Sequence, residues 1–238
     1  MEFIMRRVTL VLLAGVLVAS AHATILIDDF TSGFASGSTT TAFYYDTAGS
    51  MLGSHRYVDH RFNANPLSRP ISTDVNAATP GNMFIEAGSG VNGQVFVAWA
   101  GRVINAASSG PGALPRGNFD GLVPLNVTTE AGLQVDYINN DQSSTSIYVE
   151  MWDANFNVDA LFFQPVAAGN GSYFAAFNNF VTVQGSNTDR NNIVGIAIGL
   201  GLPNGNDITL NRVALVPEPA TMAILGLGLA ALARRKRK

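Results

Sequence analysis

Apolar and polar residues alternate in short stretches along the middle of the chain. In residues 133–138, Leu133, Val135 and Tyr137 alternate with Gln134 and Asp136. Because successive side chains of a strand point to opposite faces, this alternation predicts strands with one buried face. Similar patterns between turn residues predict further strands at 24–30, 56–62, 83–87, 94–100, 145–152, 158–164, 180–184, 193–200 and 208–215.

These stretches predict about ten to twelve short strands and no amphipathic helix, which is typical of an all-β protein. The strand count favours a jelly-roll-like β-sandwich over an immunoglobulin-like domain. Residues 31–54 and 106–120 are rich in glycine and serine, which predicts loops. We expect one domain over 24–216 rather than a division near Gly110.

The N-terminus has the pattern of a secretory signal peptide. Arg6 and Arg7 precede an apolar run over 8–20, and Ala21-His22-Ala23 gives the small-x-small pattern of a cleavage site. As a helix the run would rise about 20 Å, short of the roughly 30 Å of a hydrocarbon core, which disfavours the alternative of a membrane anchor. We expect signal peptidase to remove residues 1–23, cutting after Ala23.

The C-terminus combines three features in a fixed order. Pro217-Glu218-Pro219 comes first, and the prolines oppose continuation of a strand. A short apolar helix to Ala233 follows, marginal as a membrane span. A basic cluster that favours the cytoplasmic side then closes the chain, consisting of Arg234, Arg235, Lys236, Arg237 and Lys238. We expect this helix to engage the inner membrane transiently.

This order resembles the PEP-CTERM sorting tail. The resemblance implies that 217–238 is a sorting and anchor segment recognised by exosortase, a membrane-embedded cysteine transpeptidase-like enzyme of Gram-negative bacteria. It also implies export to the cell envelope, the cell surface or the extracellular matrix of a host that makes exopolysaccharide. Pro217, Glu218 and Pro219 are then a recognition motif, and no residue of this chain is assigned a catalytic role. A plain tail anchor is the alternative.

Charge and cysteine content exclude several classes of function. Residues 24–216 contain seven Arg, no Lys and fifteen acidic residues, a net charge of −8. An acidic body repels phosphates, so we expect no nucleic-acid partner. The chain has no cysteine, which excludes disulfides, zinc thiolate sites and thiol nucleophiles.

The first and last predicted strands carry a second, shorter resemblance. Residues 27–33 (IDDFTSG) and 207–213 (DITLNRV) resemble the outermost strands of galactose-binding-like jelly rolls. That resemblance implies sugar binding at sheet faces or end loops and a structural calcium. Because first and last strands lie together in that fold, Asp28 or Asp29 would approach Asp207, and these three are the candidate calcium ligands. No other cofactor is predicted.

Other polar residues suit a turn better than a metal or a catalytic pair. Asp153, Asn155, Asn157 and Asp159 alternate as in a calcium loop, but Val158 stands where such a loop needs glycine. We therefore expect a hairpin turn at 153–157. Carboxylate candidates for a glycoside hydrolase are Asp136, Glu150, Asp153 and Asp159.

Histidines and aromatic residues complete the candidate chemistry. His55 and His60 have opposite parity along one strand, which disfavours a metal pair and favours surface or loop positions. Trp99 and Trp152 lie in apolar runs and are expected in the core, whereas Tyr44 and Tyr45 are better candidates for stacking on sugars.

Three hypotheses for function follow. The leading one is a non-catalytic surface or matrix protein that binds polysaccharide. The second is a secreted carbohydrate-active enzyme, and the third is a structural matrix protein that self-associates. An exposed aromatic surface would favour the first, and clustered carboxylates in one concavity would favour the second.

Overall fold

The structure is a computed structural model that describes residues 24–46, 51–76, 80–100, 102–103, 119–120 and 124–218. The predicted signal peptide (1–23) and the tail after Glu218 lie outside these ranges. Within them, no helix is both long and apolar enough to cross a membrane.

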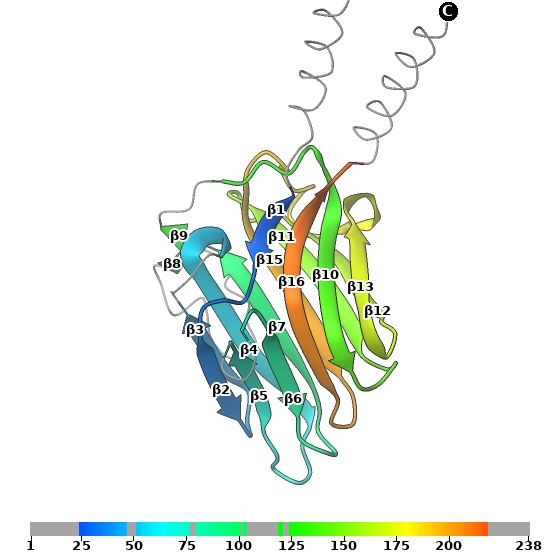
Figure 1. The fold of residues 1–238 in the computed structure, drawn as a ribbon. Coiled ribbons are helices and arrows are strands. Elements are labelled where there is room, and N and C mark those ends of the chain that lie inside the picture. Colours follow the sequence, from blue (N-terminus) through cyan, green and yellow to red (C-terminus); the bar gives the residue numbers. More distant parts are fainter. Residues whose placement is uncertain are drawn as a thin grey trace, which may run out of the picture.

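Two antiparallel sheets of seven strands pack face to face (Figure 1). We call the first sheet A. Its strands, in spatial order, are β13 (Gly169–Ala176), β10 (Glu130–Asn140), β16 (Asp207–Pro217), β6 (Met83–Ala87), β5 (Ile71–Val75) and β2 (Phe34–Ser38), with β1 (Ile25–Asp28) also paired to β16.

The second sheet is sheet B. Its strands, in spatial order, are β14 (Val181–Gln184), β12 (Val158–Pro165), β11 (Ser146–Asp153), β15 (Ile193–Leu202), β7 (Asn92–Ala100), β4 (His55–Ala64) and β3 (Ala42–Asp46). Short elements complete the described chain: the β8 (Arg102–Val103) and β9 (Phe119–Asp120) ribbon and the 3-10 turns η1 (Leu52–Ser54) and η3 (Phe177–Asn179).

Strands distant in the sequence lie side by side in both sheets. β16 lies between β10 and β6, and β15 lies between β11 and β7. The chain crosses repeatedly from one sheet to the other, as in a jelly roll. The predicted jelly-roll-like β-sandwich is confirmed.

The core lies between the sheets and follows the predicted alternation. In β10, Leu133 and Val135 are buried against the other sheet, and Val97 and Trp99 of β7 face them. Trp99 is therefore a core residue, as its apolar surroundings predicted.

All ten predicted strands are present, but four others escaped the pattern. β2 and β3 lie inside the predicted loop 31–54, so that prediction is wrong there; most of the predicted loop 106–120 lies outside the described residues. β2, β3 and β13 are edge strands with one neighbour each. Because half of an edge strand's surroundings is solvent, glycine and serine are tolerated and the apolar alternation is weak.

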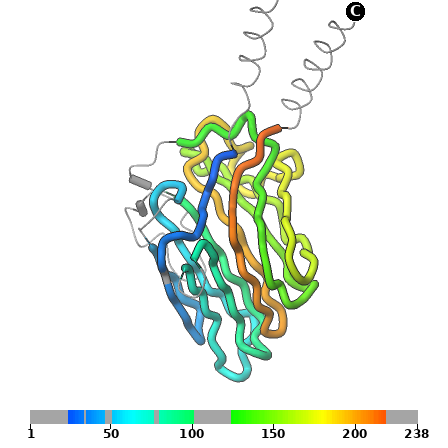
Figure 2. Tube along the Cα trace, in the orientation of Figure 1, coloured from blue at the N-terminus to red at the C-terminus, as the bar shows by residue number. Residues whose placement is uncertain are grey.

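Both ends of the described chain leave the same end of the sandwich. Ile25 of β1 pairs with Leu215 of β16 (Figure 2). We call this the terminal end. The opposite, distal end holds the start of β7, the end of β15 and the turn between β15 and β16.

Candidate functional site

The outer face of sheet B has a floor of small residues along β15. Gly195, Ala197, Gly199 and Gly201 alternate there, opposite the outward residues of β7 and β11. Side chains from neighbouring strands occupy the space that a Cβ would need. A Cβ on Gly199 would lie 2.6 Å from the Phe96 ring, and one on Gly201 would lie 2.5 Å from Ser146 Oγ. Glycine at these positions lets neighbouring side chains lie across the strand.

Aromatic rings gather over this floor. The ring centroid of Phe96 lies 5.9 Å from that of Tyr148 and 6.3 Å from that of Phe163, and Tyr148 and Phe163 are 5.3 Å apart. Edge-to-face and tilted geometries at these distances are favourable. Trp152 is fully buried in the same outer cluster rather than in the core between the sheets.

Charged groups beside these rings are already engaged with neighbours. Arg61 lies 4.0 Å above the Phe96 ring and donates from Nε to Asp59 Oδ2 at 2.6 Å. The Tyr148 hydroxyl donates to Glu150 Oε2 at 2.6 Å. The cation and the two carboxylates thus hold the aromatic cluster in place.

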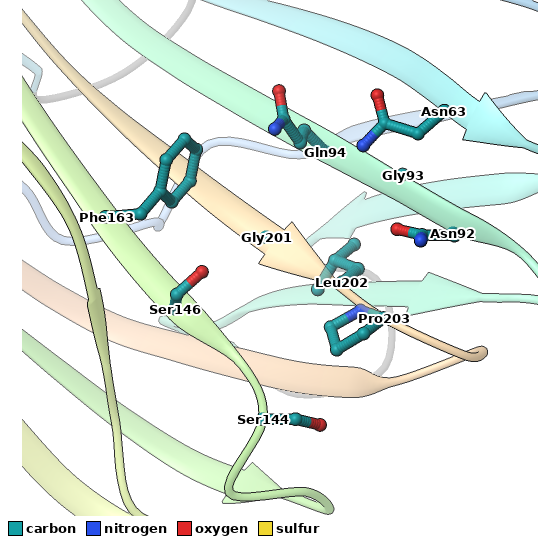
Figure 3. Close-up of a pocket in the computed structure, with 10 residues that line it drawn as sticks. All are labelled: Asn63, Asn92, Gly93, Gln94, Ser144, Ser146, Phe163, Gly201, Leu202 and Pro203. Atoms are coloured by element: carbon teal, nitrogen blue, oxygen red, sulfur yellow. The ribbon is translucent and has the colours of Figure 1, made fainter.

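A groove of about 280 Å³ opens at the distal end of this face (Figure 3). Gly201 forms part of its floor, between Ser146 of β11 and Gln94 of β7. Its other lining residues are Asn63, Asn92, Gly93, Ser144, Phe163, Leu202 and Pro203. These side chains offer amides, hydroxyls and one aromatic ring, the groups that bind a hydroxylated ligand. None of the lining side chains is titratable.

The predicted calcium ligands do not come together. β1 and β16 are neighbours as expected, but Asp28 is in register with Val213 and Asp207 with Glu86. Asp28 and Asp207 are thus about 20 Å apart along the sheet. No group of three His, Cys, Asp or Glu in the described ranges could hold a metal ion. Calcium binding stays a prediction.

Each of those three carboxylates has its own surroundings. Asp28 is buried and bonded to the Arg56 guanidinium, with Nε–Oδ2 and Nη2–Oδ1 distances of 2.8 and 3.0 Å. Asp29 accepts from the Thr31 hydroxyl at 2.6 Å. Burial, and then the charges of Glu86 and Asp141, raise the pKa of Asp207 above its ordinary value.

The predicted hairpin at 153–157 connects β11 and β12. Asp153 is buried and accepts the backbone N–H groups of Asn155 at 2.8 Å, Asn157 at 3.1 Å and Asp189 at 2.8 Å. Burial raises the pKa of Asp153, but donors from Asp189, Asn157 and Asn155 outweigh it, so the net pKa is lowered. This carboxylate organises the turn.

The four carboxylates considered for hydrolysis are dispersed. Asp136 lies in sheet A, within 3.9 Å of Arg212, whereas Glu150 lies on the outer face of sheet B. Asp159 accepts from the Thr182 hydroxyl at 2.8 Å, at the edge beside β14. With Asp153 in its turn, these groups share no single concavity among the described residues.

The histidines lie on opposite faces of β4, as their parity predicted. His55 is opposite Ala100 on the outer face, whereas His60 is buried against Thr73, with His60 Nε2 and Thr73 Oγ1 2.9 Å apart. The predicted surface position is therefore wrong for His60. Tyr45 is 65% exposed, as expected, whereas Tyr44 is half-buried and donates its hydroxyl to the Gly37 carbonyl.

The sorting motif begins inside the fold. Pro217 is the last residue of β16, opposite Glu130, where a register shift in β10 accommodates a proline. The Glu218 N–H donates to the Thr129 carbonyl at 3.1 Å. Pro219, the terminal basic cluster, and the expected cleavage residues Ala21 and Ala23 lie outside the described residues.

These observations define a β-sandwich domain with an outward groove and both chain ends together. The family model of the PEP-CTERM protein-sorting motif matches residues 215–238. The chain therefore carries this bacterial sorting motif, as predicted from its three-part tail, and the motif indicates export to the cell envelope or surface.

Solved structures with a similar arrangement of strands are distant in sequence. A family 11 carbohydrate-binding module of cellulosomal cellulase Lic26A-Cel5E from Clostridium thermocellum is 11% identical, with a TM-score of 0.44 over 84% of this chain and 97% of that one. An exo-β-agarase is 11% identical, with a TM-score of 0.42 over 82% and 25%. TmCBM61 in complex with β-1,4-galactotriose is 12% identical, with a TM-score of 0.33 over 80% and 91%. No curated protein matches the chain.

Proposed function

We propose that the body of this exported protein is a non-catalytic polysaccharide-binding domain and that the distal groove of sheet B is its binding site. The composition of the groove carries this proposal. It combines the Phe163 ring with side-chain amides and hydroxyls over a glycine floor, and none of its side chains is titratable.

Each part of the groove matches one part of a sugar. The apolar face of a pyranose ring can lie against Phe163, where its C–H groups replace water. Asn63, Asn92 and Gln94 each offer both a donor and an acceptor to sugar hydroxyls. Because Gly201 has no side chain, a chain of sugars can cross β15 close to the backbone.

The position of the groove also supports binding outside the cell. Both chain ends leave the terminal end, and the groove lies at the distal end. In our proposal, signal peptidase removes residues 1–23, the C-terminal helix holds the terminal end at the inner membrane, and exosortase processes the tail. The groove then faces away from the membrane, towards exopolysaccharide of a Gram-negative host.

The chemistry of the outer face supports binding over hydrolysis. Glycosidases use two carboxyl groups about 5–9.5 Å apart. On this face Asp59 and Glu150 lie on β4 and β11, which are separated by β7 and β15. Three strand spacings amount to about 14 Å, and both groups are buried and hydrogen-bonded. The groove itself supplies no general acid or base.

A glycan array combined with a hydrolysis assay tests this proposal. We expect the purified exported protein to bind a subset of polysaccharides without releasing new reducing ends. Release of reducing ends, abolished by Glu150→Gln or Asp159→Asn, would support the carbohydrate-active enzyme instead. Concentration-dependent assembly with no glycan bound would support the self-associating matrix protein.

A further inference from the structure

The sorting motif is continuous with a central strand of sheet A. β16 has β10 on one side and β1 and β6 on the other. Close to its end, Leu215 pairs with both Ile25 and Leu133, and Val216 pairs with Gly132. The last residues before the tail are therefore held from both sides.

Hydrogen bonding continues into the motif itself. Pro217 is in register with Glu130, and the Glu218 N–H donates to the Thr129 carbonyl at 3.1 Å. The peptide unit between Pro217 and Glu218 is thus part of the ladder, while Glu218 itself is exposed. The described ladder ends at this hydrogen bond.

Enzymes that act on a peptide bind it as an extended segment through its backbone groups. Up to the N–H of Glu218, those groups are engaged in sheet A. From this we infer that the processing site lies C-terminal to Glu218, so the mature protein keeps the whole of β16 and its first two motif residues. The inference is independent of polysaccharide binding.

The chemistry follows from the resemblance to a cysteine transpeptidase substrate. The thiolate of the processing enzyme attacks the carbonyl carbon of Glu218 or of a later residue, the C–N bond breaks, and the released amine takes a proton. Water or an amine then attacks the thioester and regenerates the thiol. The body of this protein serves as the acyl donor, and its folded edge limits which carbonyls can be attacked.

Mass spectrometry of the mature C-terminus tests the inference. The full chain is produced in a Gram-negative host with its exosortase, and the processed protein is digested and its last peptide sequenced. We expect every C-terminus to fall at Glu218 or later. A mature chain that ends at Pro217 or earlier would overturn the inference.

An insertion separates protection by the fold from the preference of the enzyme. Gly-Ser-Gly-Ser between Val216 and Pro217 moves the motif out of the ladder. A matched insertion between Ala168 and Gly169, in the exposed connection from β12 to β13, leaves the motif in place. We expect products ending N-terminal to Glu218 only from the first insertion. Identical cleavage relative to the motif in both would show that the ladder sets no limit.

Limited proteolysis checks the same protection without exosortase. A broad-specificity protease added to the detergent-solubilised, unprocessed chain should trim the tail and stop at or beyond Glu218. Trimming into 213–217 while the rest of the body stays intact would contradict the inference, whether or not either insertion variant folds.

Discussion

At the residue scale, Asp28 anchors the junction between the two sheets. Its carboxylate accepts from the Phe30 N–H, from Arg56 Nε and Nη2, and from Trp99 Nε1 at 2.6 Å. Arg56 and Trp99 belong to sheet B, whereas Asp28 belongs to sheet A. A fully buried cation is thus neutralised across the core.

Removing this carboxylate should be strongly destabilising. Asp28→Ala leaves the buried Arg56 charge with Asp46 alone, at 3.3 Å, and we expect the free energy of unfolding to fall by about 3–5 kcal/mol. Asp29→Ala is the matched control, because Asp29 bonds only within its own turn; a loss of about 1 kcal/mol or less is expected. Urea denaturation measures both, and equal losses would contradict this role.

His60 makes stability depend on pH. Burial lowers its pKa from 6.5 to about 4. As pH falls, the unfolded chain therefore takes up the proton first, and folded stability declines between pH 6.5 and 4. The decline should amount to roughly 3 kcal/mol.

The variant His60→Gln isolates this contribution. Free energies of unfolding by urea, measured at intervals from pH 7 to 4, should fall less steeply for the variant than for the wild type. His55 is present in both proteins and cancels from the comparison. Parallel curves would contradict the assignment to His60.

At the scale of elements, β15 determines the shape of the outer face. Its glycines make room for neighbouring side chains, and at Gly201 a Cβ would meet Ser146 Oγ at 2.5 Å and the Phe163 ring at 3.7 Å. A side chain at this position would lie where we propose that sugars cross the strand.

Gly201→Val should therefore abolish glycan binding while the protein stays folded. Since Ser146 can rotate, we expect a stability loss of about 1–3 kcal/mol. Gly37→Val in β2 is the control, because the nearest atom to its Cβ is 3.8 Å away. Glycan binding and circular dichroism measure both variants. Undiminished binding by folded Gly201→Val would exclude this part of the groove.

The strands were predictable where burial enforces alternation, and unpredictable where it does not. β7 and β10 have one face in the core, whereas β2 and β13 are glycine- and serine-rich edges. The groove was missed because its residues come from strands far apart in the sequence. The glycines that alternate along 195–201 were the available signal. The pairing of Asp28 with Arg56 depends on contact between sheets, which no local pattern encodes.

At the scale of the whole molecule, the adjacent chain ends set an orientation. With the terminal end held at the membrane by the tail, Asn178 in η3 would lie near the surface and Ser143 at the distal end would lie far from it. The chain has no cysteine, so a single introduced thiol reports on one position.

Labelling by a membrane-impermeant maleimide tests this orientation. In spheroplasts that retain the unprocessed protein, Ser143→Cys should react several-fold faster than Asn178→Cys. Both residues are exposed, so the two rates should converge after solubilisation in detergent. Equal rates before solubilisation would contradict the orientation.

The affinity for a polysaccharide found by array, measured by titration calorimetry for two matched variants, tests the central claim most directly. Phe163→Ala removes the ring of the groove, and Phe174→Ala removes a ring that is 47% exposed on sheet A. We predict at least about tenfold weaker binding for Phe163→Ala, equivalent to about 1.4 kcal/mol, and unchanged binding for Phe174→Ala. Wild-type affinity in Phe163→Ala would contradict the claim that this groove binds polysaccharide.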